Sequence, residues 1–239
     1  MGQHGKHRYL VKFWALLLGL CAGLVSPANA LCRQALALGL DVSSSVDATE
    51  YALQIDGLAQ ALDDSDVRRA LTGSGSGHVA LLIYEWSGKN QQVIIQPWLE
   101  ITSEDEVNQV IASLRNHPRS HDNFPTALGY AMGFGAIQFA NSPNCFRRTL
   151  DISGDGLNND GYRPKLAILN FDFATITVNG LVIAGDDADE LTTYYQNEVI
   201  YGWGAFVEVA AGYSDYARAI KRKLLRELTV MAVSQLEGQ

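Results

Sequence analysis

An acidic residue and two hydroxyl residues alternate directly after an apolar stretch near the start of the chain. Residues 35–40 are apolar, and residues 41–45 read Asp-Val-Ser-Ser-Ser. Side chains at positions i, i+2 and i+4 of an extended chain point to one side, which would place Asp41, Ser43 and Ser45 together. Carboxylate and hydroxyl oxygens suit hard cations such as Mg²⁺ or Ca²⁺. This pattern therefore predicts part of a cation site at the end of a strand.

Residues 1–30 have the features of a secretory signal peptide. Three basic residues precede an apolar run of 13 residues, 13–25, and the segment ends in Ala-Asn-Ala, as a cleavage site requires. Thirteen residues are too few to span a bilayer as a helix. We therefore predict cleavage after Ala30 and export to the periplasm or the medium. Residues 31–239 would form a single domain without a membrane span.

The charge and the cysteines of the mature chain narrow its class. Removing residues 1–30 takes away three basic residues and no acidic one, so the net charge changes from −8 to −11. An acidic domain of this kind is a poor candidate for binding nucleic acid or anionic membrane surfaces. Cys32 and Cys145 remain. In an exported protein a disulfide is the first expectation, and two buried free thiols are the alternative.

The pattern of apolar runs and turn residues predicts alternating strands and helices. We expect strands at 35–41, 78–86, 91–98, 148–153, 175–184 and 205–211, and helices at 46–70, 103–115, 126–140, 164–173, 186–200 and 213–230. This order predicts an α/β fold: a doubly wound, mostly parallel six-stranded sheet with one antiparallel edge strand and helices on both faces. Ligands of such folds bind beyond the carboxyl ends of the strands, where Asp41 and Asp155 would lie.

Three loops of this plan resemble those of a known family. Asp41, Ser43 and Ser45 after the first strand, Thr126 after a polar loop and Asp155 after the fourth strand are similar to the metal-ion-dependent adhesion site of von Willebrand factor A (vWA) domains. The resemblance implies that the three hydroxyls bind Mg²⁺ directly, with Mn²⁺ or Ca²⁺ as alternatives. It implies that the two carboxylates act largely through bound waters.

The resemblance also implies a fold and a function. It covers about residues 33–230 and implies the Rossmann-like vWA fold; the chain is similar to bacterial exported single-domain vWA proteins of unknown function. Few direct carboxylates would leave the ion an open position, which an acidic residue of a protein partner could fill. The chain is therefore expected to be a non-catalytic binding module and not an enzyme. The partner's identity and the oligomeric state stay open.

Two other functions are compatible with the same site. In a metal-assisted hydrolase, Asp155 or His121 would activate a bound water. In a purely structural role, the ion would only stabilise the fold. The sequence contains neither a Gly-x-Ser-x-Gly nor a His-Glu-x-x-His motif, which favours the binding module.

Each site residue also has a simpler interpretation. Ser45 could cap the helix expected from residue 46, Thr126 could lie in a first helical turn beside Pro125, and Asp155 could be a turn residue. Their joint occurrence at one sheet edge favours the metal site.

Three further polar residues near these loops need a role. His117 and His121 share the loop before Thr126, but imidazole suits Zn²⁺ better, which favours an ordinary surface loop. Asp151 interrupts the apolar fourth strand. It could support the metal site or face a polar neighbour, and the sequence does not decide between these.

The vWA resemblance makes the disulfide testable. In that fold the first and fourth strands are adjacent and parallel. Cys32 lies nine residues before Asp41, and Cys145 lies ten residues before Asp155. Similar offsets from one sheet edge place both cysteines near the other, so the resemblance predicts a Cys32–Cys145 disulfide.

Overall fold

A computed structural model describes residues 31–73, 77–185 and 188–234 of the chain. The predicted signal peptide at 1–30 lies outside the described residues, as do the first two residues of the helix expected at 186–200, Asp186 and Asp187. Within the described part, no helix is both long and apolar enough to cross a membrane.

The six strands form one sheet in the order β3-β2-β1-β4-β5-β6. The strands are β1 (Cys32–Asp41), β2 (His78–Trp86), β3 (Gln92–Ile101), β4 (Arg147–Gly154), β5 (Ile176–Ile183) and β6 (Val207–Ala210). Only the β2–β3 pair is antiparallel, and β3 lies at the edge. The predicted mostly parallel sheet with one antiparallel edge strand is confirmed.

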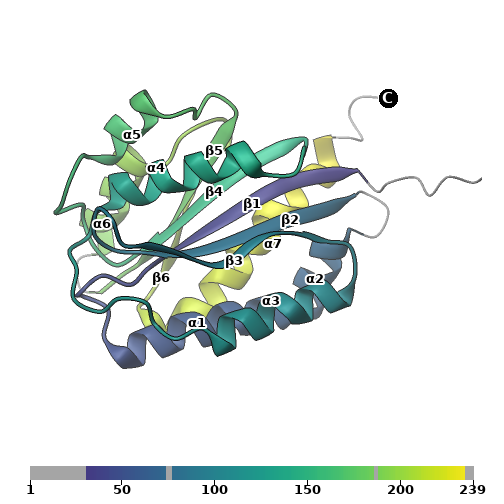
Figure 1. Cartoon of the computed structure of the whole chain (residues 1–239), viewed down its shortest axis with the longest axis horizontal. Coiled ribbons are helices and arrows are strands. Elements are labelled where there is room, and N and C mark those ends of the chain that lie inside the picture. Colours follow the sequence, from purple (N-terminus) through teal and green to yellow (C-terminus); the bar gives the residue numbers. More distant parts are fainter. Residues whose placement is uncertain (1–30, 74–76, 186–187, 235–239) are drawn as a thin grey trace, which may run out of the picture.

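Helices cover both faces of the sheet (Figure 1). They are α1 (Ala48–Asp63), α2 (Ser65–Thr72), α3 (Glu104–Asn116), α4 (Leu128–Gln138), α5 (Pro164–Asn170), α6 (Ala188–Tyr194) and α7 (Tyr216–Ser234). Short 3₁₀ turns span Phe139–Asn141 and Tyr213–Asp215, and a π-helical turn spans Tyr195–Val199. The first three helices and α7 pack on one face, and α4, α5 and α6 pack on the other (Figure 1).

Strand β1 runs through the centre of the molecule and is buried along its whole length. Its leucines Leu36, Leu38 and Leu40 enter the core beneath α1, α3 and α7, and its small alternate residues face α4. The apolar run without alternating polar residues follows from this burial on both faces. Glycines let α4 lie close to the sheet: a Cβ at Gly135 would be 2.6 Å from the Leu150 side chain.

Several helix boundaries differ from expectation. The prediction of a single helix at 46–70 is wrong, because α1 and α2 are separated at Asp64. The extended backbone of Asp64 ends α1. Its carboxylate accepts a hydrogen bond from the Asp66 N–H and so caps the start of α2. Acidic side chains compete for backbone donors in this way, and propensity alone does not locate the break. The helix expected at 186–200 ends in the π-helical turn.

The predicted disulfide is confirmed. Cys32 and Cys145 are bonded, with their Cα atoms 4.6 Å apart. The bond joins positions 113 residues apart in sequence. In the chain-entropy account, closing a loop of that length stabilises the folded state by roughly 4–5 kcal/mol.

Three buried charged side chains attach α7 to the centre of the sheet. The Asp151 carboxylate and the Lys223 ammonium are 2.5 Å apart, and Lys223 also contacts Glu227 at 2.7 Å. Asp151 therefore faces a charged partner on α7. Burial raises the pKa of Asp151 to about 7 although Lys223 opposes the rise. Burial disfavours the charged form of Lys223, but the two acids outweigh it and raise the pKa of Lys223 above its ordinary value.

Replacing Lys223 by methionine should lower the free energy of unfolding by about 3–5 kcal/mol, because two acids would stay buried without their cation. Without the cation, Asp151 would be protonated in the folded state and ionised in the unfolded state between about pH 4 and pH 7 or above. The folded state would bind more protons there, so the stability of the variant should fall as pH rises. Urea unfolding at pH 5 and pH 8 measures both effects.

Lys221→Met is the matched control for that experiment. Lys221 lies on the same helix, is partly exposed and contacts Asp64 at 2.7 Å. Its loss should cost much less stability than the loss of Lys223, because solvent screens an exposed ion pair. Equal losses in the two variants, or a pH-independent loss in Lys223→Met, would show that the buried charges do not anchor α7.

Candidate functional site

The chain turns sharply at the end of β1. Residues 41–45 do not remain extended as expected: β1 ends at Asp41, and the Val46 N–H donates to the Ser43 carbonyl at 3.0 Å. Two longer-range bonds fix this turn. The Val42 N–H donates to Trp86 O at 2.9 Å, and the Ser44 N–H donates to Phe124 O at 2.8 Å. The turn, and not strand alternation, directs the side chains.

The five predicted site residues form one hydrogen-bonded group, which we call the oxygen cluster: Asp41, Ser43, Ser45, Thr126 and Asp155. The Thr126 hydroxyl donates to the Ser43 hydroxyl at 3.2 Å, and the hydroxyls of Ser43 and Ser45 are 3.2 Å apart. The Ser45 hydroxyl donates to the Asp155 carboxylate at 2.7 Å. The Ser43 N–H donates to the Asp41 carboxylate at 2.8 Å. Oxygen ligands from three loops thus meet at the carboxyl edge of the sheet.

Asp41 is the buried carboxylate of the oxygen cluster. Its side chain is fully buried, and among the described residues its Oδ2 has no hydrogen-bond partner. Burial raises the pKa of Asp41 to about 8, the Asp155 charge adds to the rise, and the Ser43 N–H opposes it. A nearby positive charge has the opposite effect on a carboxyl group, because it stabilises the ionised form. The electrostatics of the cluster therefore suit a cation.

The simpler interpretations of Ser45 as a helix cap and of Thr126 as a residue of a first helical turn are wrong. The N-cap of α1 is Asp47, which forms a capping box with Glu50. The first residue of α4 is Leu128, so Thr126 lies in the loop before that helix. The hydroxyls of Ser45 and Thr126 thus have no capping role, and both bond within the oxygen cluster.

A glycine lets β4 pass beside the cluster. A Cβ at Gly154 would lie 3.0 Å from the Asp41 Oδ2 atom and 2.5 Å from the Tyr195 hydroxyl. Tyr195 is fully buried and begins the π-helical turn, an irregularity often found at functional sites. Any larger residue at 154 would displace one of these oxygens.

Arg119 stabilises the turn after β1 through hydrogen bonds to its backbone, a role that the sequence did not predict. One Nη donates to the carbonyls of Val42, Ser43 and Val46 at 3.1, 3.2 and 2.7 Å. Its Nε donates to His121 O at 2.8 Å. An arginine in a polar loop carries no local signal for this role, because the three carbonyls of the turn lie more than 70 residues earlier in the chain.

The other polar loop residues divide into supporting and separate groups. Asn159 pairs with the backbone of Thr126 in both directions, at 2.9 and 3.0 Å, and so fixes its position. His117 lies 3.3 Å from the buried Glu85, and the His121 ring packs edge-on against Phe124. These contacts are separate from the oxygen cluster.

The sheet order, the helices on both faces and a polar site beyond β1 and β4 define a vWA fold. One similar solved structure is mussel byssus proximal thread matrix protein 1 "with zinc occupied MIDAS motif", at 13% identity and a TM-score of 0.60 over 84% of this chain and 49% of that one. A second is the von Willebrand factor type A protein of Catenulispora acidiphila, at 14% identity and a TM-score of 0.60 over 82% of this chain and 43% of that one. A third is the PilB minor pilin of Streptococcus sanguinis, at 12% identity and a TM-score of 0.59 over 84% of this chain and 63% of that one. At these identities the likeness concerns the fold alone, and this chain spans about half the length of the mussel and Catenulispora structures.

The chain belongs to the family described as "Protein of unknown function (DUF1194)", whose model matches residues 31–232. A comparison with curated proteins gives no significant match.

Replacing Arg119 by methionine should lower the free energy of unfolding by about 1.5–3 kcal/mol, because three carbonyls lose a charged donor. The amides of Ser44 and Val46 should also exchange hydrogen faster, since the turn that protects them is loosened. Urea unfolding and hydrogen exchange measure the two effects. Arg115→Met, at an exposed position on α3, is the control and should change neither; unchanged exchange in Arg119→Met would contradict the anchoring role.

Proposed function

We propose that this protein is an exported, non-catalytic binding module that holds a divalent cation in the oxygen cluster and docks a protein partner through that cation. The observation that carries the proposal is the convergence of three hydroxyls and two carboxylates from three loops on one point. The partner would supply an acidic side chain to complete the coordination of the ion.

The donor set favours Mg²⁺. Hydroxyl and carboxylate oxygens are hard ligands, and Mg²⁺ commonly keeps waters and an exchangeable position. Among the described residues, no three His, Cys, Asp or Glu side chains gather as a metal-binding group. Mn²⁺ and Ca²⁺ use the same oxygen chemistry. The mussel relative with an occupied MIDAS motif holds zinc, which supports a divalent site in this fold.

Apolar side chains beside the oxygen cluster support docking of a protein. Phe124, whose carbonyl accepts from Ser44, is 36% exposed, and Leu157, two residues after Asp155, is 39% exposed. A polar anchor next to exposed apolar surface is the usual composition of a protein-binding hot spot and its surroundings. The pilin relative supports an extracellular binding role.

Mg²⁺ should stabilise the protein against unfolding, by about 2.7 kcal/mol when its concentration is 100 times the Kd. Ser43→Ala should lose this stabilisation, because it removes the hydroxyl that joins both halves of the cluster. Ser44→Ala is the matched control: Ser44 is the exposed neighbour in the same turn. Thermal unfolding with Mg²⁺ and with EDTA measures the difference. Equal Mg²⁺ stabilisation of the two variants would contradict the metal site.

Partner capture tests the docking step separately. Immobilised wild-type protein and Ser44→Ala should retain the same proteins from the native periplasm in Mg²⁺ and release them in EDTA, and Ser43→Ala should not retain them. Identical capture by all three would refute cation-dependent docking. Turnover of a phosphoester or peptide panel by wild type, absent in Asp41→Ala, would instead favour a hydrolase.

A further inference from the structure

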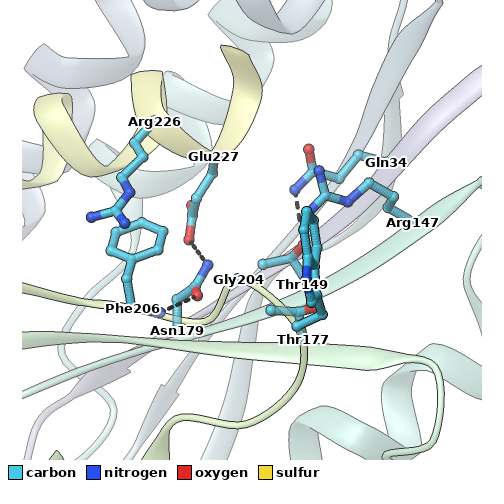
Figure 2. Close-up of a pocket in the computed structure, with 10 residues that line it drawn as sticks. Gln34, Arg147, Thr149, Thr177, Asn179, Gly204, Phe206, Arg226 and Glu227 are labelled. Atoms are coloured by element: carbon cyan, nitrogen blue, oxygen red, sulfur yellow. Dashed lines mark hydrogen bonds between the residues drawn. The ribbon is translucent and has the colours of Figure 1, made fainter. Parts of the chain in front are cut away.

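A cavity of about 220 Å³ lies at the end of the sheet opposite to the oxygen cluster (Figure 2). It is enclosed by the first residues of β1, β4 and β5, the segment before β6 and the last turns of α7. The residues that matter for its chemistry are Gln34, Arg147, Asn179, Trp203, Phe206 and Glu227. The cavity is smaller than the roughly 300–1,000 Å³ of sites for drug-sized ligands, so it suits a ligand of a few heavy atoms.

One wall of the cavity carries a buried carboxylate. Glu227 is 4% exposed, and its Oε1 accepts from Asn179 at 2.6 Å and from Lys223 at 2.7 Å. Its Oε2 has no hydrogen-bond partner among the described residues. Behind the cavity, Lys223 also contacts Asp151, and Arg226 is a second cation in the lining. An unpaired buried acceptor costs about 1–3 kcal/mol, which a bound N–H donor would offset.

The opposite wall carries a positive charge. Arg147 is half-buried, and within the described chain its guanidinium makes no ion pair or side-chain hydrogen bond. Figure 2 shows Arg147 beside Gln34, across the cavity from Glu227. Gln34 is 1% exposed and donates to Thr149 at 3.0 Å, whereas its Oε1 has no partner in that part of the chain. This wall therefore offers a charged donor and one more acceptor.

Aromatic groups complete the cavity. The Arg226 guanidinium lies over the Phe206 ring, with its Cζ atom 3.7 Å from the ring centre. Trp203, the other aromatic residue, is 85% exposed. Both residues line the cavity, and in the view of Figure 2 Phe206 lies beyond Glu227 as seen from Arg147. They add apolar surface against which a small aliphatic group could pack.

We propose that this cavity binds a small zwitterion of the α-amino acid class. Its carboxylate would pair with Arg147, its ammonium would donate to the free oxygens of Glu227 and Gln34, and its short side chain would lie against Phe206. A ligand of one charge alone would leave either the Arg147 guanidinium or the Glu227 Oε2 atom without a partner. This proposal is independent of the cation site.

Isothermal titration of the purified protein with glycine, L-alanine and L-serine tests the proposal. Acetate lacks the ammonium and ethylamine lacks the carboxylate, so they serve as half-ligands. At least one amino acid should bind with a Kd of about 1 mM or lower, and both half-ligands should bind at least about tenfold more weakly. If none of the three amino acids binds, the proposal is overturned and water alone fills the cavity. If acetate binds as tightly as the amino acids, the proposal is also overturned and the cavity is an anion site.

Adjacent arginines provide a matched pair of variants. Arg147→Gln should weaken binding of the amino acid at least about tenfold, the usual scale for losing a charge-assisted contact. Arg148→Gln should leave it within about twofold, because residue 148 faces the other side of the sheet and its side chain contacts Thr175. Equal losses would contradict the assignment. If Arg147→Gln does not fold, Glu227→Gln is the variant to measure. It should abolish the preference for the amino acid over acetate. An unchanged preference would refute the proposed site.

Discussion

The parallel pairing of β1 with β4 is the constraint on which the rest of the structure depends. In its register Leu40 lies opposite Ser153, so the two strands end at the same edge and their loops meet there. The same pairing brings Cys32 and Cys145 together at the other edge. Because a parallel ladder fixes both ends at once, a slip by one residue would separate the site and disrupt the disulfide.

The residues that stabilise the oxygen cluster lie next to it, on neighbouring loops and at the end of β4. A fully buried Asp41 is tolerated because a backbone N–H reaches it and because Gly154 leaves it room. Arg119 and Asn159 then fix the backbone on either side, so the hydroxyls are positioned before any ligand arrives. Such preorganisation reduces the ordering cost of binding.

The two ends of the sheet differ in their chemistry. At the carboxyl end, the five residues of the oxygen cluster carry hydroxyls and carboxylates, and none of the five is basic. At the amino end lies a cavity with Glu227 on one wall and an arginine on the other, and Glu227 belongs to the buried charged group with Asp151 and Lys223. Buried charges are costly unless paired, and this cost is the common physical basis of the two binding sites that we propose.

The sequence by itself determined the order of strands and helices, the edge at which Asp41 and Asp155 meet, and the disulfide once the vWA likeness placed β1 beside β4. These features follow from local periodicity and from the ends of strands, which a sequence displays directly. Only the tertiary structure decided the turn after Asp41, the anchoring by Arg119 and the pairing of Asp151 with Lys223. Those contacts join residues far apart in the chain, so they depend on how packed elements face one another, which no local pattern encodes.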